Sequence, residues 1–372
     1  MSSRAYVQAA VDAGYEVIAL DVFADADVKA IANQIFKLSM RENLLDEVDF
    51  KRIFLQLNLT NIHGFVYGSL FDNCPDLLDW VAERVPLIGN TSDVLKQAKA
   101  FSFFKQLDDL GIAHPEVRLR SPSIPNPSAP NWLFKKIGGT GGMHIKPAIQ
   151  AADGESFQQG YFQKMQAGTP ISMLFVADGK AAKTIGFNQQ LIAPTTELPY
   201  RFAGAVSGIA LLSNIHEAFE QAAQKLANAF NLRGINSLDA ILDNNQLWIL
   251  ELNPRLSATF QLYPNLFALH IQGCAGNLDD FLPFTNPSHA QYILYADKTL
   301  EIAADFVWPD WAADIPTVED EVFNIRTSIK SGAKISENMP ICSVLAQADT
   351  AEIAHSLLLQ RAKNLTEALY ND

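Results

Sequence analysis

Two apolar segments in the second half of the chain carry isolated polar side chains, and this pattern constrains the fold more than any other. Residues 235–242 (INSLDAIL) and 247–254 (LWILELNP) are separated by a short polar turn, which predicts two antiparallel strands joined as a hairpin. Glu251, Asn253 and Arg255 alternate along the second strand, so they point to one face at intervals of about 6.6 Å. A carboxylate within such an apolar run requires a cation or a polar partner, because an unpaired buried charge is unstable.

The register of this hairpin decides whether Asp239 joins the same face. Asp239 pairs with Glu251 only if the turn has an odd number of residues or the ladder contains a bulge. We expect a three-residue turn at 244–246, whereas a flush two-residue hairpin would place Asp239 on the opposite face. With Asp239 included, the face offers two carboxylates and the amide oxygen of Asn253, which are hard oxygen ligands suited to Mg²⁺. An ordinary half-exposed strand with a surface Glu is the alternative.

A second polar cluster lies earlier in the chain, in the segment KKIGGTGGMHI of residues 135–145. Glycines allow a backbone to approach phosphate oxygens closely, and Lys135 at the end of an expected strand adds a positive charge. The segment lacks the GxxxxGK[ST] pattern of a P-loop, and no protein-kinase catalytic loop or DFG triplet follows it. We interpret it as a phosphate-binding hairpin, and the alternative is a mobile Gly-rich hairpin with incidental lysines.

The N-terminal part of the chain has the pattern of a small α/β lobe with a parallel sheet. A helix over residues 4–14 is followed by the apolar strand EVIAL (16–20) and by further apolar runs at 62–67 and 85–88. Such a unit ordinarily begins with a strand, and none precedes this helix, so the first strand is missing or lies upstream. No GxGxxG follows a strand, and a dinucleotide-binding fingerprint is therefore absent.

The remainder of the chain is expected to be α+β. A helical pattern over residues 91–110 leads to a Pro- and Ser-rich loop at 121–131, after which strands predominate. Asp178-Gly179 predicts a hairpin turn, and amphipathic patterns predict helices at about 214–230 and 350–369.

Composition narrows the functional classes. The 28 Lys and Arg residues are outnumbered by 41 Asp and Glu, and the formal charge of −13 argues against a general affinity for nucleic acid or for an anionic membrane. No apolar run is long enough to span a bilayer and no signal peptide begins the chain, which predicts a cytoplasmic protein. The 3 cysteines are far apart and predict neither a disulfide framework nor a zinc site.

In the order of its motifs the chain resembles the ATP-grasp superfamily, and within it the predicted carboligases related to biotin carboxylase. The resemblance covers nearly the whole chain. It implies an ATP-grasp fold in four parts: a Rossmann-like pre-ATP-grasp lobe (1–94), a subdomain with the Gly-rich loop (95–165), a subdomain with the metal strands (166–285) and a C-terminal lobe (286–372).

The resemblance also implies roles for individual residues. ATP would be bound by Lys99, Lys135, Gly139, Gly141, Gly142, Gln163, Lys164 and Met165, the metal by Asp239, Glu251 and Asn253, and catalysis would involve Arg255 and Lys135. Two positions depart from the family pattern, because Lys136 stands where proline is common and Lys164 where Glu is common. The main chain at 163–165 would therefore recognise adenine, and Arg255 would hold the acyl phosphate or the substrate carboxylate.

Several of these residues have structural alternatives. Lys99 could belong to a solvated helix face, and Arg255 could pair with Glu251 to stabilise the fold. His144 is the one histidine near the predicted chemistry, as a candidate acid or base. Ser257, Thr259 and Tyr263 follow the second strand either as pocket-lining groups or as helix-start and packing residues.

The implied function is an ATP- and Mg²⁺-dependent ligase, with Mn²⁺ as an alternative metal. A carboxylate would attack the γ-phosphate to form an acyl phosphate with release of ADP, and an amine or related nucleophile would then displace phosphate. The partners would be small-molecule carboxylates and amines, without nucleic acid or membrane, and a homodimer is allowed. The alternatives are a biotin-carboxylase-like ATP-dependent carboxylase and a non-catalytic ATP-binding regulator.

Overall fold

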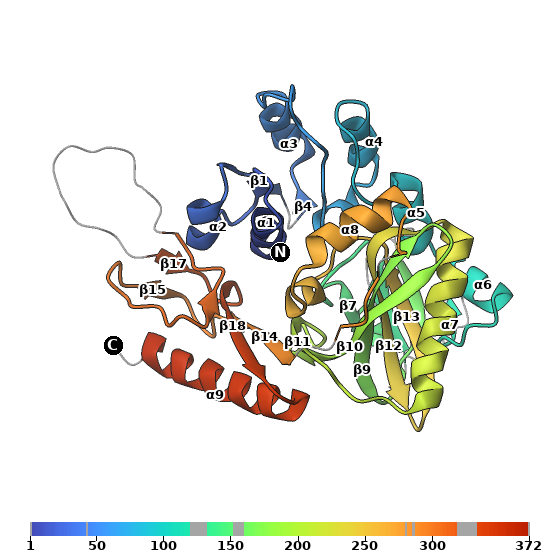
Figure 1. Cartoon of the computed structure of the whole chain (residues 1–372). Coiled ribbons are helices and arrows are strands. Elements are labelled where there is room, and N and C mark those ends of the chain that lie inside the picture. Colours follow the sequence, from blue (N-terminus) through green and yellow to red (C-terminus); the bar gives the residue numbers. More distant parts are fainter. Residues whose placement is uncertain are drawn as a thin grey trace.

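An eight-stranded antiparallel sheet runs through the centre of the computed structural model (Figure 1). The structure describes residues 2–41, 44–119, 132–151, 160–279, 281–284, 287–317 and 333–370. The sheet has the strand order β13-β12-β9-β10-β11-β14-β18-β16. Its strands are β9 (Thr169–Asp178), β10 (Ala182–Ile192), β11 (Phe202–Ser207), β12 (Arg233–Asp243), β13 (Gln246–Asn253), β14 (Ser288–Tyr295), β16 (Ala312–Ala313) and β18 (Pro340–Ala348).

Strand β9 is apolar along most of its length because it is covered on both faces. Met173 and Phe175 pack in one core with helix α7 (Ser213–Phe230). Leu174 and Val176 point the other way and pack in a second core with helix α8 (Leu266–Ala275). The sheet is therefore the middle layer of the molecule, and its polar positions are exceptions in an apolar surround.

The N-terminal lobe contains the expected parallel pairing, since β1 pairs with β2 in parallel. The other two predicted runs meet only at a parallel bridge between Phe65 and Leu87. The predicted helix at 4–14 is confirmed as α1. The elements of the lobe are α1 (Arg4–Asp12), β1 (Ile18–Asp21), α2 (Ala26–Ile31), β2 (Gln34–Lys37), β3 (Met40–Arg41), β4 (Leu44–Leu45), α3 (Glu47–Phe54), η1 (Ser69–Asn73) and α4 (Asp76–Ala82).

A small antiparallel sheet follows, in the order β5-β8-β6-β7. Its strands are β5 (Val117–Arg118), β6 (Trp132–Lys136), β7 (Ile145–Pro147) and β8 (Gly160–Lys164), with η2 (Ala148–Ala151) after β7. The single helix predicted at 91–110 is wrong: the segment forms α5 (Ser92–Lys99) and α6 (Ser102–Asp109), separated by the extended residue Ala100. The break lets Leu95 join the N-terminal core while Phe103 enters the core of the large sheet. The Pro- and Ser-rich loop at 121–131 lies outside the described residues.

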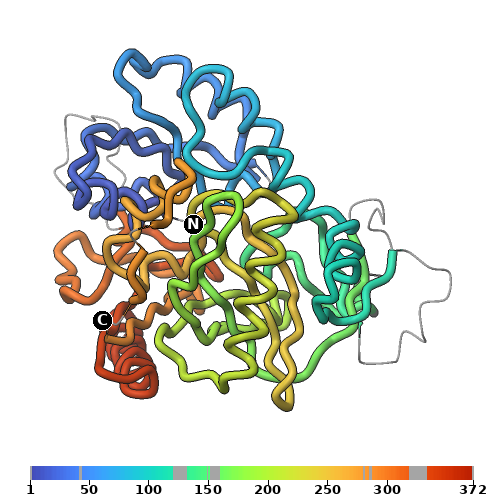
Figure 2. The backbone as a smooth tube through the Cα atoms, turned by 45° about the vertical axis from the view of Figure 1, so that its right-hand side comes forward, coloured from blue at the N-terminus to red at the C-terminus, as the bar shows by residue number. Residues whose placement is uncertain are grey.

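The C-terminal part continues the large sheet rather than forming a separate layer. Strand β14 pairs with β11. The helix predicted at 350–369 is confirmed as α9 (Ala351–Tyr370), whose apolar side chains pack against β14 and β18. The short strands β15 (Leu300–Ile302) and β17 (Ala333–Ile335) form a separate pair. Arg4 contacts Asp314 at 2.9 Å, and Figure 2 shows the blue N-terminal trace beside the orange C-terminal segments. Among the described residues no helix is long and apolar enough to cross a membrane.

Both predicted hairpins are present, but the second has a different turn from the one expected. β9 and β10 pair around Asp178-Gly179 as predicted. In the β12–β13 hairpin Asp243 pairs with Gln246, so the turn has two residues, Asn244 and Asn245, both with positive φ. The three-residue turn at 244–246 was therefore wrong.

A β-bulge, and not an odd-numbered turn, brings Asp239 opposite Glu251. The register shifts between Asp239 and Ala240, so that Ala240 pairs with Ile249 while Asp239 pairs with Glu251. Leu250 is the extra residue. The predicted pairing of Asp239 with Glu251 is thus confirmed, and both side chains lie on one face of the sheet.

Asn90 fastens the N-terminal lobe to this hairpin. The residue is 2% exposed, and its Nδ2 donates to the carbonyls of Arg233 and Pro254, at 3.0 Å each, and to Oδ1 of Asn236 at 2.9 Å. Its Oδ1 accepts from the amide of Arg233 at 2.7 Å. One side chain therefore ties the start of β12 to the end of β13, where the polar face of the hairpin terminates.

We predict that Asn90→Ala destabilises the protein by roughly 2–4 kcal/mol, because several buried groups lose their partner at once. Thermal and urea unfolding measure this loss. Asn58→Ala is the matched control, since Asn58 is exposed and bonds only within its own turn. Equal unfolding midpoints for the two variants would contradict the role given to Asn90.

Candidate nucleotide and metal site

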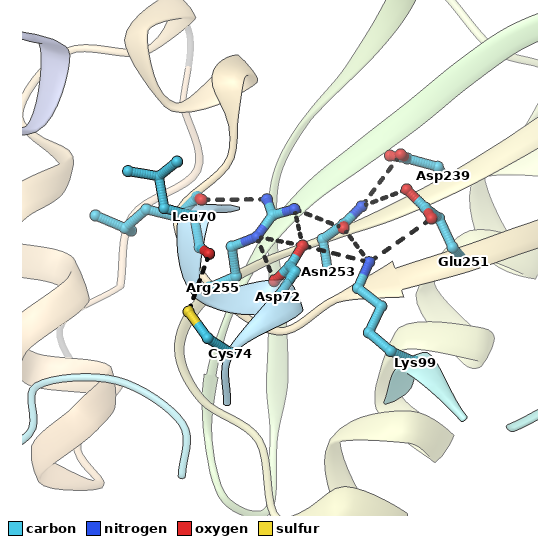
Figure 3. A network of polar contacts seen from close by, with 9 residues as sticks. Leu70, Asp72, Cys74, Lys99, Asp239, Glu251, Asn253 and Arg255 are labelled. Carbon is cyan, nitrogen blue, oxygen red and sulfur yellow. Dashed lines mark hydrogen bonds and ion pairs between the residues drawn. The ribbon is translucent and has the colours of Figure 1, made fainter. Parts of the chain in front are cut away.

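The centre of the candidate site is the polar face of the β12–β13 hairpin. Asn253 lies between the two carboxylates, and its Nδ2 donates to Asp239 Oδ2 at 3.2 Å and to Glu251 Oε1 at 3.1 Å (Figure 3). The side chain of Glu251 is 34% exposed, so a ligand can reach the pair. The bulge at Leu250 brings these three side chains together.

The two carboxylates have opposite pKa shifts. Burial, the charge of Glu251 and a hydrogen bond to it raise the pKa of Asp239 to about 7. Burial also raises the pKa of Glu251, but the charges of Lys99 and Lys135 outweigh it and hold that pKa below its usual range. Near pH 7 the pair therefore tends to hold one proton, which a cation would displace.

Lys99 approaches this face from the last residue of α5. Its Nζ donates to Asn253 Oδ1 at 2.8 Å and lies 3.7 Å from Glu251 Oε2 and 3.6 Å from Asp72 Oδ2. The lysine side chain is 9% exposed. The structure thus places Lys99 on the hairpin's polar face rather than on the solvated helix face that was the alternative.

Lys135 faces the same carboxylates from the small sheet. It is buried, and the charges of Glu251 and Asp239 act on its ammonium, although burial lowers its pKa overall. Within the part of the chain that the structure describes, the ammonium of Lys135 has no hydrogen bond or ion pair. Lys136 points to the opposite side of β6 and is exposed. An unpaired buried ammonium beside two carboxylates is suited to an anionic ligand held between them.

The Gly-rich loop between β6 and β7 is folded onto the large sheet. The amide of Phe202 donates to the carbonyl of Gly141 at 2.9 Å. Gly142 has φ +72°, and a Cβ there would lie 1.8 Å from the carbonyl oxygen of Tyr200. A Cβ on Gly139 would lie within 2.1 Å of the His144 ring. Positions 139 and 142 therefore require glycine, because any larger residue would collide with the His144 ring or the Tyr200 carbonyl while the loop lies against the sheet.

His144 is neutral in this environment. Burial lowers its pKa to about 4, and the positive charges of Lys135 and Lys99 act in the same direction against the charge of Glu251. Its buried Nδ1 has no hydrogen-bond partner among the described residues. The ring packs against Gly139, so its clearest role is to shape the loop.

The hinge at 163–165 offers three different environments. Gln163 is 1% exposed, and its Nε2 is buried without a partner in the described residues. The amide of Lys164 already donates to Glu116 at 2.8 Å. The amide of Met165, just beyond β8, has no hydrogen bond within the described ranges. Gln163 and Met165 therefore retain donors for a ligand, whereas the amide of Lys164 does not.

Arg255 is held by a residue that the sequence did not indicate. Its Nη2 lies 2.6 Å from Asp72 Oδ2 and its Nε donates to both Asp72 oxygens, while Nη2 also donates to Asn253 Oδ1 at 3.0 Å (Figure 3). Burial disfavours the charged form, but Asp72 raises the pKa of Arg255 and keeps it ionised. Both side chains are almost fully buried, at 4% and 0% exposed. The structural partner of Arg255 is thus Asp72 and not Glu251.

Sequence reasoning missed two residues of the site. Asp72 comes from η1 in the N-terminal lobe, 183 positions before Arg255, and no local pattern marks it. Tyr161 pairs with Lys135 across β6 and β8, and burial together with the charge of Glu251 raises its pKa. Tyr161 was within reach of sequence analysis, because it lies two residues before Gln163 and so shares its face.

Three residues beyond β13 are satisfied internally. η4 (Ala258–Leu262) starts after Ser257, whose Oγ lies 2.9 Å from Thr259 Oγ1, and both are buried. Tyr263 donates to Asn188 Oδ1 at 2.7 Å. They occupy helix-start and packing positions.

The residues present fit magnesium and a nucleotide phosphate. No group of three or more His, Cys, Asp or Glu side chains arranged for a metal occurs in the described residues. Asp239 and Glu251 supply part of an oxygen shell, as is usual where Mg²⁺ also binds phosphate and water. Asn253 turns its Nδ2 toward these carboxylates and its Oδ1 toward Lys99 and Arg255, so its amide would have to reverse to bind a cation through oxygen. Lys135 stands opposite this set and lacks a partner of its own. The two sides together offer a cation position and an anion position.

Parts of the chain are similar to known protein families and proteins. A protein-family model of the ATP-grasp domain matches residues 98–259. The arginine-specific large chain of carbamoyl phosphate synthase from Bacillus subtilis is 24% identical over 185 residues, which are 45% of this chain and 17% of that protein. The uncharacterized protein MJ0776 of Methanocaldococcus jannaschii is 22% identical over 286 residues, 73% of this chain and 66% of that protein. The chain spans less than two thirds of each relative's length.

Solved structures with the same fold include biotin carboxylase domains. The biotin carboxylase domain of Hydrogenobacter thermophilus 2-oxoglutarate carboxylase, in complex with MgADP, ADP and bicarbonate, has a TM-score of 0.71 at 13% identity and covers 95% of this chain and 86% of its own. Biotin carboxylase from Campylobacter jejuni has a TM-score of 0.70 at 13% identity, covering 96% and 88%. Residues 98–259 of this chain thus match the ATP-grasp domain, and the chain has the fold of biotin carboxylase domains.

We predict that Asp239→Asn raises the melting temperature by a few degrees at pH 8 without metal. The pKa of Asp239 is raised on folding, so its contribution to stability is complete below about pH 4 and lost as the pH rises through about 7. Neutral Asn avoids this loss. Added Mg²⁺ should stabilise the wild type and not the variant.

Asp243→Asn, at the turn of the same hairpin, is the control and should keep the wild-type response to Mg²⁺. The advantage of Asp239→Asn should shrink at pH 5. A variant that is equally stable at pH 5 and pH 8 relative to the wild type, or that still responds to Mg²⁺, would contradict the assignment.

We predict that Gly142→Ala releases the Gly-rich loop and Gly141→Ala does not. Both residues have positive φ, but a Cβ on Gly141 meets nothing within 4 Å, while one on Gly142 meets the Tyr200 carbonyl. Both variants carry about 1–2 kcal/mol of backbone strain. Hydrogen exchange of the Phe202 amide should accelerate only in Gly142→Ala; equal exchange in the two variants would show that close packing does not hold the loop.

Proposed function

We propose that the protein is a ligase that uses MgATP to activate a carboxylate as an acyl phosphate and joins it to an amine or a related nucleophile. The observation that carries the proposal is the pairing of Asp239 and Glu251 with Asn253, directly opposite the buried and unpaired Lys135. The ATP-grasp match over residues 98–259 supports use of ATP, and the homologous solved structures include a complex with MgADP.

The carboxylate side and the lysine side of the site have different roles in this scheme. Asp239, Glu251 and Asn253 would hold Mg²⁺, which neutralises phosphate charge when it is bound. Lys135 and the backbone of the Gly-rich loop would hold the β- and γ-phosphates. The Nε2 of Gln163 and the amide of Met165 would donate to adenine. Lys99, which now bonds Asn253, would turn its charge toward the phosphates.

The reaction proceeds in two displacements. A carboxylate oxygen of the substrate attacks the γ-phosphorus, the bond to the β,γ-bridging oxygen breaks, and ADP leaves. The nucleophile's nitrogen then attacks the acyl carbon, the carbon–oxygen bond breaks, and phosphate leaves with the loss of one proton from nitrogen. In this scheme the described side chains position groups and neutralise charge, without forming a covalent bond to the substrate.

Arg255 requires a narrower role than the family resemblance implies. Its donors are committed to Asp72, Asn253 and the carbonyl of Leu256. We therefore propose that Arg255 positions Asn253, and that it would contact an acyl phosphate only after exchanging one of these bonds.

A biotin-carboxylase-like carboxylase is the second candidate, because the structures that cover most of this chain are biotin carboxylase domains, one of them in complex with bicarbonate. In that case bicarbonate is the carboxylate substrate. The same structure is described as a dimer, and a homodimer is part of our proposal. A regulator that binds MgATP without turnover is the remaining candidate.

We predict that Lys135→Ala and Glu251→Gln each lower ADP release by at least about 100-fold, since each removes a charge that acts on the transferring phosphoryl group. The assay follows ADP and phosphate over a panel of carboxylic acids, amines and bicarbonate. Lys136→Ala is the matched control, because Lys136 is the exposed neighbour on the opposite side of β6.

Thermal unfolding separates a loss of activity from a loss of structure. Lys135→Ala should be at least as stable as the wild type, because it removes an unpaired buried ammonium. Wild-type rates in Lys135→Ala, or equal losses in Lys135→Ala and Lys136→Ala, would refute the site. AMP as the product would refute the acyl-phosphate scheme. Tight MgATP binding without turnover against the whole panel would favour the regulator.

A further inference from the structure

The N-terminal lobe meets the C-terminal part of the chain where residues 25–27 contact residues 312–315, and we call this contact the seam (Figure 2). Three backbone amides donate across it. The amide of Ala26 donates to the carbonyl of Ile315 at 2.9 Å. In the other direction, the amides of Asp314 and Ile315 donate to the carboxylate of Asp27 at 2.7 and 3.3 Å. The seam therefore depends on Asp27 remaining in place.

Three carboxylates at the seam have donors of their own. Arg4, the first residue of α1, donates through Nε to Asp314 at 2.9 Å and lies 3.5 Å from Asp27. Asp21, at the end of β1, is 1% exposed and accepts hydrogen bonds from two amides of the turn that follows it, at 2.6 and 2.8 Å. Each of these negative charges is therefore stabilised where it lies.

Asp25 is different from its neighbours. It is 4% exposed, and its buried Oδ2 has no hydrogen-bond partner among the described residues. It occupies the N-cap position of α2, yet its side chain makes no capping hydrogen bond. A buried carboxylate without a partner is unstable as an anion and much less so as a neutral acid.

The surroundings of Asp25 favour the neutral acid. Burial raises the pKa of Asp25 to about 7, and the charges of three neighbouring carboxylates act in the same direction, those of Asp314, Asp21 and Asp27. A hydrogen bond with Ser2 acts in the opposite direction. Asp25 therefore changes its charge close to neutral pH.

Two other titratable groups lie at the seam. The guanidinium of Arg4 is already engaged with Asp314 and Asp27. The thiol of Cys342 in β18 is neutral, because burial and the charges of the same two carboxylates raise its pKa. Among the residues that the structure describes, the seam carboxylates are not arranged to hold a metal ion. A proton is therefore the species that neutralises Asp25.

We propose that Asp25 is a pH-dependent switch, which holds the seam closed as a neutral acid and loosens it when it ionises. An ionised Asp25 repels Asp27, the residue that accepts both amides of the C-terminal segment. Opening the seam relieves this repulsion and lets water reach the new charge.

The direction of the pH dependence follows from the raised pKa of Asp25. Its contribution to the stability of the seam is complete below about pH 4 and is lost as the pH rises through about 7. The seam is therefore closed in mildly acidic solution and looser in mildly alkaline solution.

Helix α1 connects the seam to the buried ion pair of the candidate site. Arg4 at its start bonds to the seam, and Tyr6 lies close enough to Arg255 and Asp72 for their charges to act on its hydroxyl. A looser seam would give α1 more freedom beside this pair. The proposal itself rests on the seam, and it stands or falls independently of any ligase activity.

Hydrogen exchange of the full chain measures the seam directly. The amides of Ala26, Asp314 and Ile315 are followed between pH 5 and pH 8, with rates corrected for the intrinsic pH dependence of exchange. We expect their protection to fall about tenfold from pH 6 to pH 8 in the wild type and to stay constant in Asp25→Asn. Asp12→Asn is the matched control, since Asp12 is exposed and bonds only to Gln8, and it should keep the wild-type profile.

A second measurement does not depend on the variant. The carboxyl carbon shift of Asp25, titrated by NMR in the wild type, should have its midpoint near pH 7, and a midpoint near pH 4 would overturn the proposal. Constant protection of the seam amides in the wild type, or an unchanged profile in Asp25→Asn, would also overturn it.

Two further controls separate the switch from other causes. Mg²⁺, Ca²⁺ or K⁺ at constant pH and ionic strength should leave the protection of the seam amides unchanged, and a cation that restores protection at pH 8 would show a cation site instead. Asp239→Asn should keep the wild-type profile at the seam. Its loss in that variant would show that the pH dependence originates in the candidate site.

Discussion

The buried ion pair between Arg255 and Asp72 is the interaction on which the rest of the site depends. It joins η1 of the N-terminal lobe to the residue that follows β13, and through Asn253 it reaches both carboxylates. Removing one partner of a buried pair leaves an unpaired charge at a cost of about 3–5 kcal/mol. The pair therefore holds η1 and the β12–β13 hairpin in one arrangement.

Opposite charges from the large and the small sheet face one another at the candidate site. Two carboxylates on the β12–β13 hairpin face two lysines, one from α5 and one from β6. Burial disfavours the charged forms of Asp239 and Lys135 more than the neighbouring charges favour them, so the pKa of Asp239 is raised and that of Lys135 is lowered. Such an arrangement is unfavourable for the empty protein and favourable once a cation and a phosphate fill it. Gly142, which lies against the Tyr200 carbonyl, and the hydrogen bond from Phe202 to Gly141 hold the Gly-rich loop against the large sheet.

Local sequence patterns predicted individual helices and strands more reliably than the turns, breaks and long-range contacts between them. The alternation of Glu251 and Asn253 and the apolar strands around them identified the hairpin and the pairing with Asp239, but the turn type was wrong because a bulge cannot be distinguished from an odd turn without the register. The helix break at Ala100 follows from packing into two cores, with no Pro or Gly to mark it. Asp72 lies far along the chain from its ion-pair partners Lys99 and Arg255, so no local spacing could indicate it. The roles of the nucleotide residues remain predictions, although the structure brings Lys99, Lys135, Glu251 and Asn253 together.

The most direct test of the account is a crystal structure with Mn²⁺ and a non-hydrolysable ATP analogue, in which anomalous scattering locates the metal. We expect the Mn²⁺ peak at about 2.1 Å from carboxylate oxygens of Asp239 and Glu251, with phosphate oxygens completing its shell. Lys135 should contact the β- or γ-phosphate, and the Nε2 of Gln163 or the amide of Met165 should contact adenine. A metal bound elsewhere, or a nucleotide that contacts neither Lys135 of β6 nor the polar face of β13, would contradict the central claim.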